Sequence, residues 1–131
     1  MVLLTFTAPT RPLSENESRR LHWAARKRRL DDWKTLTAVA WRKADPEDKK
    51  TLEGSKIVVK VSLPFSRKAR RDAHNYIGTN IKAIIDSLIS EGMAKDDTDE
   101  FIEVLEPSLI VDKTDQVVIL LTPKKERECQ N

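Results

Sequence analysis

The alternation of apolar and polar residues predicts several short β-strands. From Ile57 to Leu63, Val and Lys side chains alternate, which is typical of a strand with one buried face, and Pro64 is expected to end it. The other segments with strand-like patterns are Val2–Phe6, Phe101–Leu105 (resuming at Leu109–Val111) and Val117–Thr122. A turn at Asp112–Asp115 is expected to make the last segment the closing strand of a hairpin.

Two further segments carry apolar residues at helical spacing. The first predicts a helix from Leu30 to Lys43. The second predicts a helix that begins at Gly78 or Thr79 and ends at the Gly92 stop. Its apolar stripe consists of Ile81, Ile84, Ile85, Leu88 and Ile89. Upstream, Ser14 and Glu17 have the spacing of a capping box. The segment 19–29 that follows is too basic for a simple amphipathic helix, and its pattern does not indicate where a helix begins.

The predicted elements follow the order β-α-β-loop-α-loop-β-β. This order favours an α/β fold of the two-layer α+β kind, with two main helices on a small mixed β-sheet. The connectors are polar or charged at residues 44–55, 66–75 and 95–100. A chain of 131 residues fills one core, so we expect a single domain over residues 1–123 and a frayed tail at 124–131.

Composition narrows the class of protein. No apolar stretch approaches the roughly 20 residues needed to span a bilayer, and the opening residues lack the basic region of a signal peptide. The one cysteine, Cys129, excludes an internal disulfide framework and a multi-cysteine zinc site. We therefore expect a soluble, cytoplasmic protein in a reducing compartment.

The formal net charge of +3 conceals a strong split along the chain. Residues 1–82 hold 19 basic and 9 acidic side chains, whereas residues 83–131 hold 5 basic and 12 acidic ones. A basic half suggests a polyanionic partner, and an acidic half suggests solvation or cation binding. The charge split by itself does not choose between these interpretations.

Acidic residues lie on both sides of the second predicted helix. Asp72 precedes the helix, and Asp96 and Asp97 follow it. If the chain brings such carboxylates together, they provide the oxygen ligands that Mg²⁺ requires, and Lys82 nearby would stabilise charge on a phosphoryl group. Spacing alone does not distinguish this site from ordinary solvated acids, nor Lys82 and Asp86 from an ordinary helix ion pair.

Three motifs make the sequence resemble the RusA family of Holliday-junction resolvases. They are Arg70-Arg-Asp-Ala-His-Asn75, Lys82-Ala-Ile-Ile-Asp-Ser-Leu88 and Gly92-Met-Ala-Lys-Asp-Asp97. The family has an R-D-x-D-N loop, a helix with K-x-x-x-D-x-L and a G-x-x-x-D-D element before the next strand. The stretches Leu13-Ser-Glu-Asn16 and Leu21-His-Trp-Ala-Ala-Arg26 also look like phage-type members, so the resemblance covers most of the chain.

Two departures from the family pattern concern the predicted site. His74 stands where the family has the second aspartate of its D-x-D, and the interval from Asn75 to Lys82 is three residues longer than the shorter family spacing. An actinobacterial and phage subgroup is similar in this respect, which indicates a variant site. His74 is open to several interpretations: a turn residue, a metal ligand, a phosphate contact, or an acid or base.

The resemblance implies a homodimeric endodeoxyribonuclease that uses Mg²⁺ or Mn²⁺ to nick two symmetric strands of four-way DNA junctions during recombination and repair. It implies no membrane and no small-molecule cofactor. The implied catalytic residues are Asp72, His74, Lys82 and Asp97, the metal ligands are Asp72, Asp96 and Asp97, and Asp86 is a supporting acid. The implied DNA contacts are Arg67, Lys68, Arg70, Arg71, Asn75 and Lys82, and the segment 19–29 could extend this surface.

Two other functions remain open on the same fold. One is a non-catalytic or weakly active module that binds branched DNA and has lost activity through His74. The other is a flap or single-strand nuclease that uses the same site. Junction, flap and linear duplex substrates distinguish the three functions.

Overall fold

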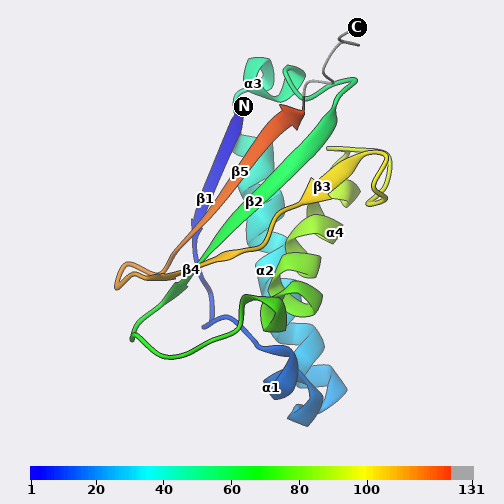
Figure 1. Cartoon of the computed structure of the whole chain (residues 1–131). Coiled ribbons are helices and arrows are strands. Elements are labelled where there is room, and N and C mark those ends of the chain that lie inside the picture. The colour runs from blue at the N-terminus through cyan, green and yellow to red at the C-terminus, as the bar shows by residue number, and fades with distance from the viewer. Residues whose placement is uncertain (125–131) are drawn as a thin grey trace, which may run out of the picture.

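A five-stranded mixed sheet forms the centre of the computed structural model, which describes residues 1–124 (Figure 1). The strands are β1 (Val2–Thr7), β2 (Lys56–Phe65), β3 (Ile102–Val104), β4 (Ser108–Val111) and β5 (Gln116–Lys124). β5 lies between β1 and β2 and is antiparallel to both, whereas β3 and β4 both run parallel to β2 on its other side. β2 is therefore the central strand of the sheet.

Helices cover one face of this sheet, and the expected two-layer mixed α/β fold is confirmed. The helical elements are α1 (Glu15–Arg20), α2 (Trp23–Lys43), α3 (Pro46–Lys50), the 3₁₀-helix η1 (Ala73–Tyr76), the π-helix η2 (Ile77–Ile81) and α4 (Lys82–Ser90). Figure 1 shows α2 and α4 behind the sheet, and the Ser87 hydroxyl of α4 donates a hydrogen bond to the Lys34 carbonyl of α2 (2.7 Å). α2 and α4 are the two main helices.

The core lies between these two helices and the sheet. Side chains in β1 and β5 alternate between buried and more exposed positions, as a sheet covered on one face requires. Fully buried members of the core include Trp33, Val59, Leu63, Ile84, Leu88, Ile119 and Leu121. In the part of the chain that the structure describes, no helix has both the length and the apolar character to cross a bilayer.

The strand predictions hold for position but not for every pairing. The expected closing hairpin is wrong, because β5 pairs with β1 and β2 while β4 pairs with β2. β2 also continues past the expected stop at Pro64 to Phe65. Proline is tolerated there because the β5 ladder ends at Ser62, so the edge that faces β5 needs no further N–H donor.

The first helix prediction was too short, whereas the second spans most of η2 and all of α4. α2 begins at Trp23, seven residues before the predicted start, and α3 lies inside the predicted connector. The Ser14 hydroxyl caps α1 by accepting a bond from the Glu17 amide (3.1 Å). Gly92 follows α4 with a φ of 92°, the left-handed conformation for which a glycine stop is suited.

One residue of the predicted tail, Lys124, belongs to β5 and pairs with Lys56 of β2. The remainder of that tail, including Cys129, lies outside the described residues.

Candidate functional site

An arginine-rich loop connects the end of β2 to η1. Arg67, Lys68 and Arg70 are exposed along it. Arg71 anchors the loop, because its guanidinium lies over the Phe65 ring (4.1 Å to the centroid) and donates to the Arg67 carbonyl (2.9 Å). Arg71 therefore fixes the loop, and the other three cations face the solvent.

Asp72 and His74 lie where this loop enters η1. The Asp72 carboxylate caps η1 by accepting a bond from the His74 amide (3.0 Å), and the Asn75 amide donates to the Asp72 carbonyl (3.0 Å). The His74 ring points to a different partner, with Nε2 3.5 Å from the Glu106 carboxylate. The Lys60 ammonium donates to the Glu106 carbonyl. The His74 side chain thus meets the connector between β3 and β4.

The three extra residues before Lys82 fall in a stretch that contains the π-helix η2. A π turn accommodates an inserted residue within a continuous helical segment and is frequent at functional sites. The Gly78 amide donates to the Glu15 carboxylate of α1 (3.0 Å). A Cβ at Gly78 would lie 2.2 Å from that carboxylate oxygen, so a larger residue there would displace the Glu15 side chain.

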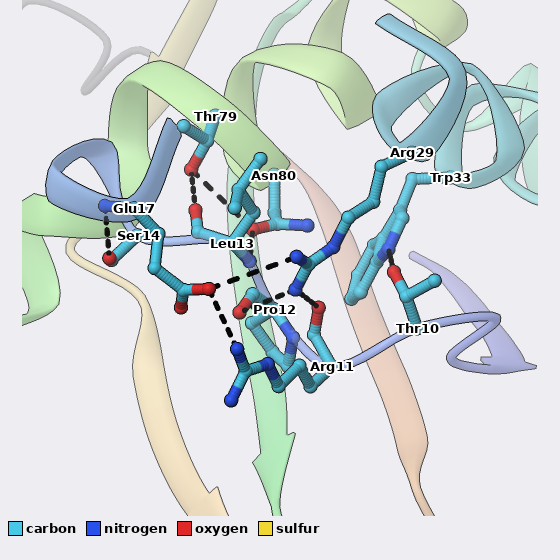
Figure 2. A network of polar contacts seen from close by, with 10 residues as sticks. All are labelled: Thr10, Arg11, Pro12, Leu13, Ser14, Glu17, Arg29, Trp33, Thr79 and Asn80. Carbon is cyan, nitrogen blue, oxygen red and sulfur yellow. Dashed lines mark hydrogen bonds and ion pairs between the residues drawn. The ribbon is translucent and has the colours of Figure 1, made fainter. Parts of the chain in front are cut away.

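Buried hydrogen bonds connect the N-terminal segment, residues 10–17, to the same π turn. Figure 2 shows Thr79 and Asn80 on either side of the Leu13 backbone. The Leu13 amide donates to Asn80 Oδ1 (2.7 Å), and the Thr79 hydroxyl donates to the Leu13 carbonyl. Because Leu13 and Asn80 are fully buried, water cannot replace these bonds.

Arg29 extends this network from α2 to the same N-terminal segment. Its guanidinium donates to the Arg11 carbonyl (2.7 Å) and lies 3.8 Å from the Glu17 carboxylate (Figure 2). Burial lowers the pKa of Arg29 from its ordinary value, and Glu17 opposes this effect. One turn further along α2, the Trp33 indole donates to the Thr10 hydroxyl (3.0 Å). α1, α2 and η2 are therefore joined through residues 10–17.

Lys82, Asp86 and Asp97 line one shallow hollow of about 250 Å³ beside α4, which we call the α4 hollow. Lys82 and Asp86 lie one helical turn apart, with the ammonium 3.4 Å from the carboxylate. Asp97 reaches the hollow from the loop before β3. The apolar lining is formed by Ile77, Ile81, Ile85, Ile102 and Val104. One cation and two carboxylates thus border an opening with apolar walls.

The other predicted acids take different positions. Asp96 Oδ1 accepts a bond from the Thr98 amide (2.8 Å), and this bond holds the pKa of Asp96 below its ordinary value. Neither Asp96 nor Asp72 lines the α4 hollow. Over residues 1–124, no three His, Cys, Asp or Glu side chains gather closely enough to hold a metal ion together. The structure therefore unites Lys82, Asp86 and Asp97 and leaves Asp72, His74 and Asn75 on η1.

The donors of the α4 hollow suit a hard divalent cation. Mg²⁺ is commonly held by one or two carboxylates, with water and substrate phosphate completing its coordination. Asp86 and Asp97 provide such oxygen donors next to solvent. They are the residues that would hold Mg²⁺ or Mn²⁺ here, with Lys82 as the neighbouring cation.

Sequence reasoning missed the residues that support the site from a distance. Glu106 is 32 positions from His74, and neither Glu15 nor Leu13 carries a motif that indicates contact with residues 78–80. The available signal for Asn80 was its place four residues before Ile84 on the apolar face of the predicted helix, since an amide buried there needs partners.

Comparisons with known proteins add no assignment. No protein-family model matches the chain, and no curated protein matches it either.

Proposed function

We propose that this chain is a Mg²⁺- or Mn²⁺-dependent endodeoxyribonuclease of the RusA type, which binds four-way DNA junctions and cuts two symmetric strands in recombination or repair. One observation carries the proposal: Lys82, Asp86 and Asp97 line the same solvent-open hollow. Two of these positions come from the K-x-x-x-D element and the third from the G-x-x-x-D-D element.

The chemistry follows from the needs of phosphodiester hydrolysis. A water oxygen bonds to phosphorus and that water gives up a proton to the solvent, while one phosphorus–oxygen bond to a sugar breaks and the departing sugar oxygen takes up a proton. Lys82 stabilises the negative charge that grows on the phosphoryl oxygens. A divalent cation at Asp86 and Asp97 would supply Lewis acidity and a more acidic water.

The arginine-rich loop supplies the binding step. Arg67, Lys68 and Arg70 are exposed and lead directly into the helical segment that carries Lys82. Contacts from such side chains to phosphates give affinity without sequence information, as recognition of a branched structure requires. Asp72 and His74 lie between this loop and the α4 hollow along the chain. We assign them to the DNA-facing edge of the site.

Two symmetric cuts favour a two-fold arrangement. A four-way junction offers two equivalent strands, so a homodimer would place one α4 hollow at each of them. Cytoplasmic action on DNA belongs to the same proposal.

A junction-cleavage assay with matched variants tests the function. The wild-type chain, Asp97→Asn and Asp86→Asn are incubated with a synthetic four-way junction and with Mg²⁺ or Mn²⁺. We expect each Asn variant to lose nicking while junction binding, measured without metal, stays within a few-fold. Asp99→Asn is the control, because it makes the same change at an exposed position of the loop that carries Asp97.

The outcomes separate the alternatives. Normal cutting by both Asn variants would show that the site is assigned wrongly. Binding of the junction without cutting in any metal would favour the non-catalytic module, for which the absence of Asp72 from the α4 hollow lining is the structural argument. Preferential cutting of flap or single-stranded substrates would identify the third function.

A further inference from the structure

A groove between α2 and α4, distinct from the α4 hollow, carries an exposed tryptophan and several cations. It encloses about 500 Å³ and is bordered by the first half of α2, by η2 and by the start of α4. Trp23 lies at the first turn of α2 and is 64% exposed. We call this surface the α2–α4 groove.

Trp23 differs from the other two tryptophans of the chain. Trp33 and Trp41 belong to the core, with exposures of 0% and 8%. The Trp23 indole contacts the neighbouring His22 ring, at 5.7 Å between centroids, and otherwise presents its surface to solvent. A large exposed aromatic ring has an unfavourable free energy in water, and such rings are enriched where a partner covers them.

The charges along the groove favour an anionic partner. Arg26, Lys27, Lys34 and Lys82 line it, with Asp31 and Asp86 as the acids. Lys27 pairs with Asp31 (2.6 Å) and Lys82 with Asp86 (3.4 Å). Among the described residues, Arg26 and Lys34 form no ion pair, which leaves the groove with two uncompensated cations. Residues 19–29 add further positive charge near the groove, because this segment holds six Arg or Lys and no acid.

The groove and the α4 hollow are neighbours. Gly78, Lys82 and Asp86 line both of them. From Trp23 to Lys34 the α2 axis advances by roughly 16 Å, about the length of five stacked nucleotides of one strand. A strand lying along the groove would therefore arrive at the residues proposed to act on phosphate.

The exposed indole distinguishes an unpaired strand from a duplex. Bases inside a duplex are stacked on each other and offer no free face, whereas an unpaired base can stack on an aromatic side chain whatever its identity. We propose that the α2–α4 groove binds an unpaired DNA segment, with one base stacked on Trp23 and phosphates held by Arg26 and Lys34. This inference deepens the proposed function, on which it rests for the substrate class.

Fluorescence measures this binding directly. Because Trp33 and Trp41 are buried, quenching by a single-stranded oligo(dT) of about ten nucleotides reports on Trp23. The full chain is titrated without divalent metal, so that binding is separated from cutting, and labelled oligo(dT) gives the affinity of each variant by anisotropy. We expect Trp23→Ala to weaken binding by about five- to hundredfold and Trp23→Phe to retain most of the affinity.

Charge variants complete the test. Arg26→Gln with Lys34→Gln should weaken binding and reduce its salt dependence, while Lys43→Gln with Lys50→Gln, an equal charge change outside the groove, should change it much less. Equal affinity of Trp23→Ala and wild type would overturn the inference, and so would a blunt duplex that binds better than oligo(dT) with no dependence on Trp23. Trp23-dependent binding without any nicking would support the groove and contradict the nuclease, whereas nicking with no effect of Trp23 would do the opposite.

Discussion

Replacing Asn80 with alanine tests whether the N-terminal segment holds the π turn in place. The change removes Oδ1, which accepts the Leu13 amide at 2.7 Å. Leu13 and Asn80 have no measurable exposure, so the freed amide would remain buried without a partner. The buried hydrogen bond is the interaction under test.

The expected change in the free energy of unfolding has two parts, the hydrogen bond that is lost and the unpaired polar group that is removed. A buried donor without a partner costs about 1–3 kcal/mol. Within residues 1–124, the Asn80 side-chain amide nitrogen has no hydrogen-bond partner, so its removal returns part of that cost. We therefore expect the free energy of unfolding to fall by about 1–2 kcal/mol, which lowers Tm by roughly 3–10 °C for a domain of this size.

Urea unfolding followed by circular dichroism measures the change. Asn16→Ala is the matched control, because Asn16 is exposed on α1 and should change stability by less than about 0.5 kcal/mol. Thr79→Val removes the bond to the Leu13 carbonyl. Since both bonds hold one residue, the double variant should lose less than the sum of the single changes. A change below about 0.5 kcal/mol in Asn80→Ala, or strict additivity with Thr79→Val, would refute this account.

Two further predictions concern the contacts at either end of the same helical segment. Gly78→Ala would displace the flexible Glu15 carboxylate, because the new Cβ would lie 2.2 Å from it, and should cost about 0.5–1.5 kcal/mol for the lost Glu15–Gly78 hydrogen bond. In a Glu15→Ala background the same change should be neutral or stabilising by up to about 1 kcal/mol. An equal urea-unfolding cost in both backgrounds would contradict the proposed clash. At the other end, Arg42 donates to Glu91 (2.9 Å), which holds the pKa of Glu91 below its ordinary value of 4.5. The unfolded chain takes up this proton first as pH falls, so the stabilisation is present above about pH 4.5 and is lost below it. Glu91→Gln should therefore show a smaller fall of Tm on acidification than wild type or the exposed control Glu53→Gln, and equal slopes would contradict this assignment.

Local patterns in the sequence were sufficient for the elements that depend on local interactions. The stripe that includes Ile81, Ile84 and Leu88 forms the buried face of η2 and α4, because helical spacing places these residues on one side. The pairing of β5 was not accessible in this way. A strand pattern specifies which face is buried, whereas its neighbours are chosen by the packing of the whole sheet. The fold class could be predicted, and the hairpin could not.

The same division applies to the candidate site. Lys82 and Asp86 lie one turn apart on a helix, so their proximity follows from spacing alone. That Asp97, and not Asp96, lines the α4 hollow depends on the turn in which the Thr98 amide binds Asp96. The approach of His74 to Glu106 depends on the connector between two parallel strands. No sequence pattern fixes either of these arrangements.

The basic and acidic portions of the sequence meet at one place in the structure. Lys82 is the last cation of the basic portion, Asp86 is the first acid of the acidic portion, and their side chains lie 3.4 Å apart. The α2–α4 groove extends from this pair toward Trp23 and the cations of α2, and the α4 hollow extends toward Asp97. For the proposed nuclease, we therefore expect a substitution at Lys82 to alter DNA binding and phosphate chemistry together. Trp23 lines only the groove and Asp97 lines only the hollow. Variants of these two residues therefore distinguish the proposed binding step from the proposed chemical step.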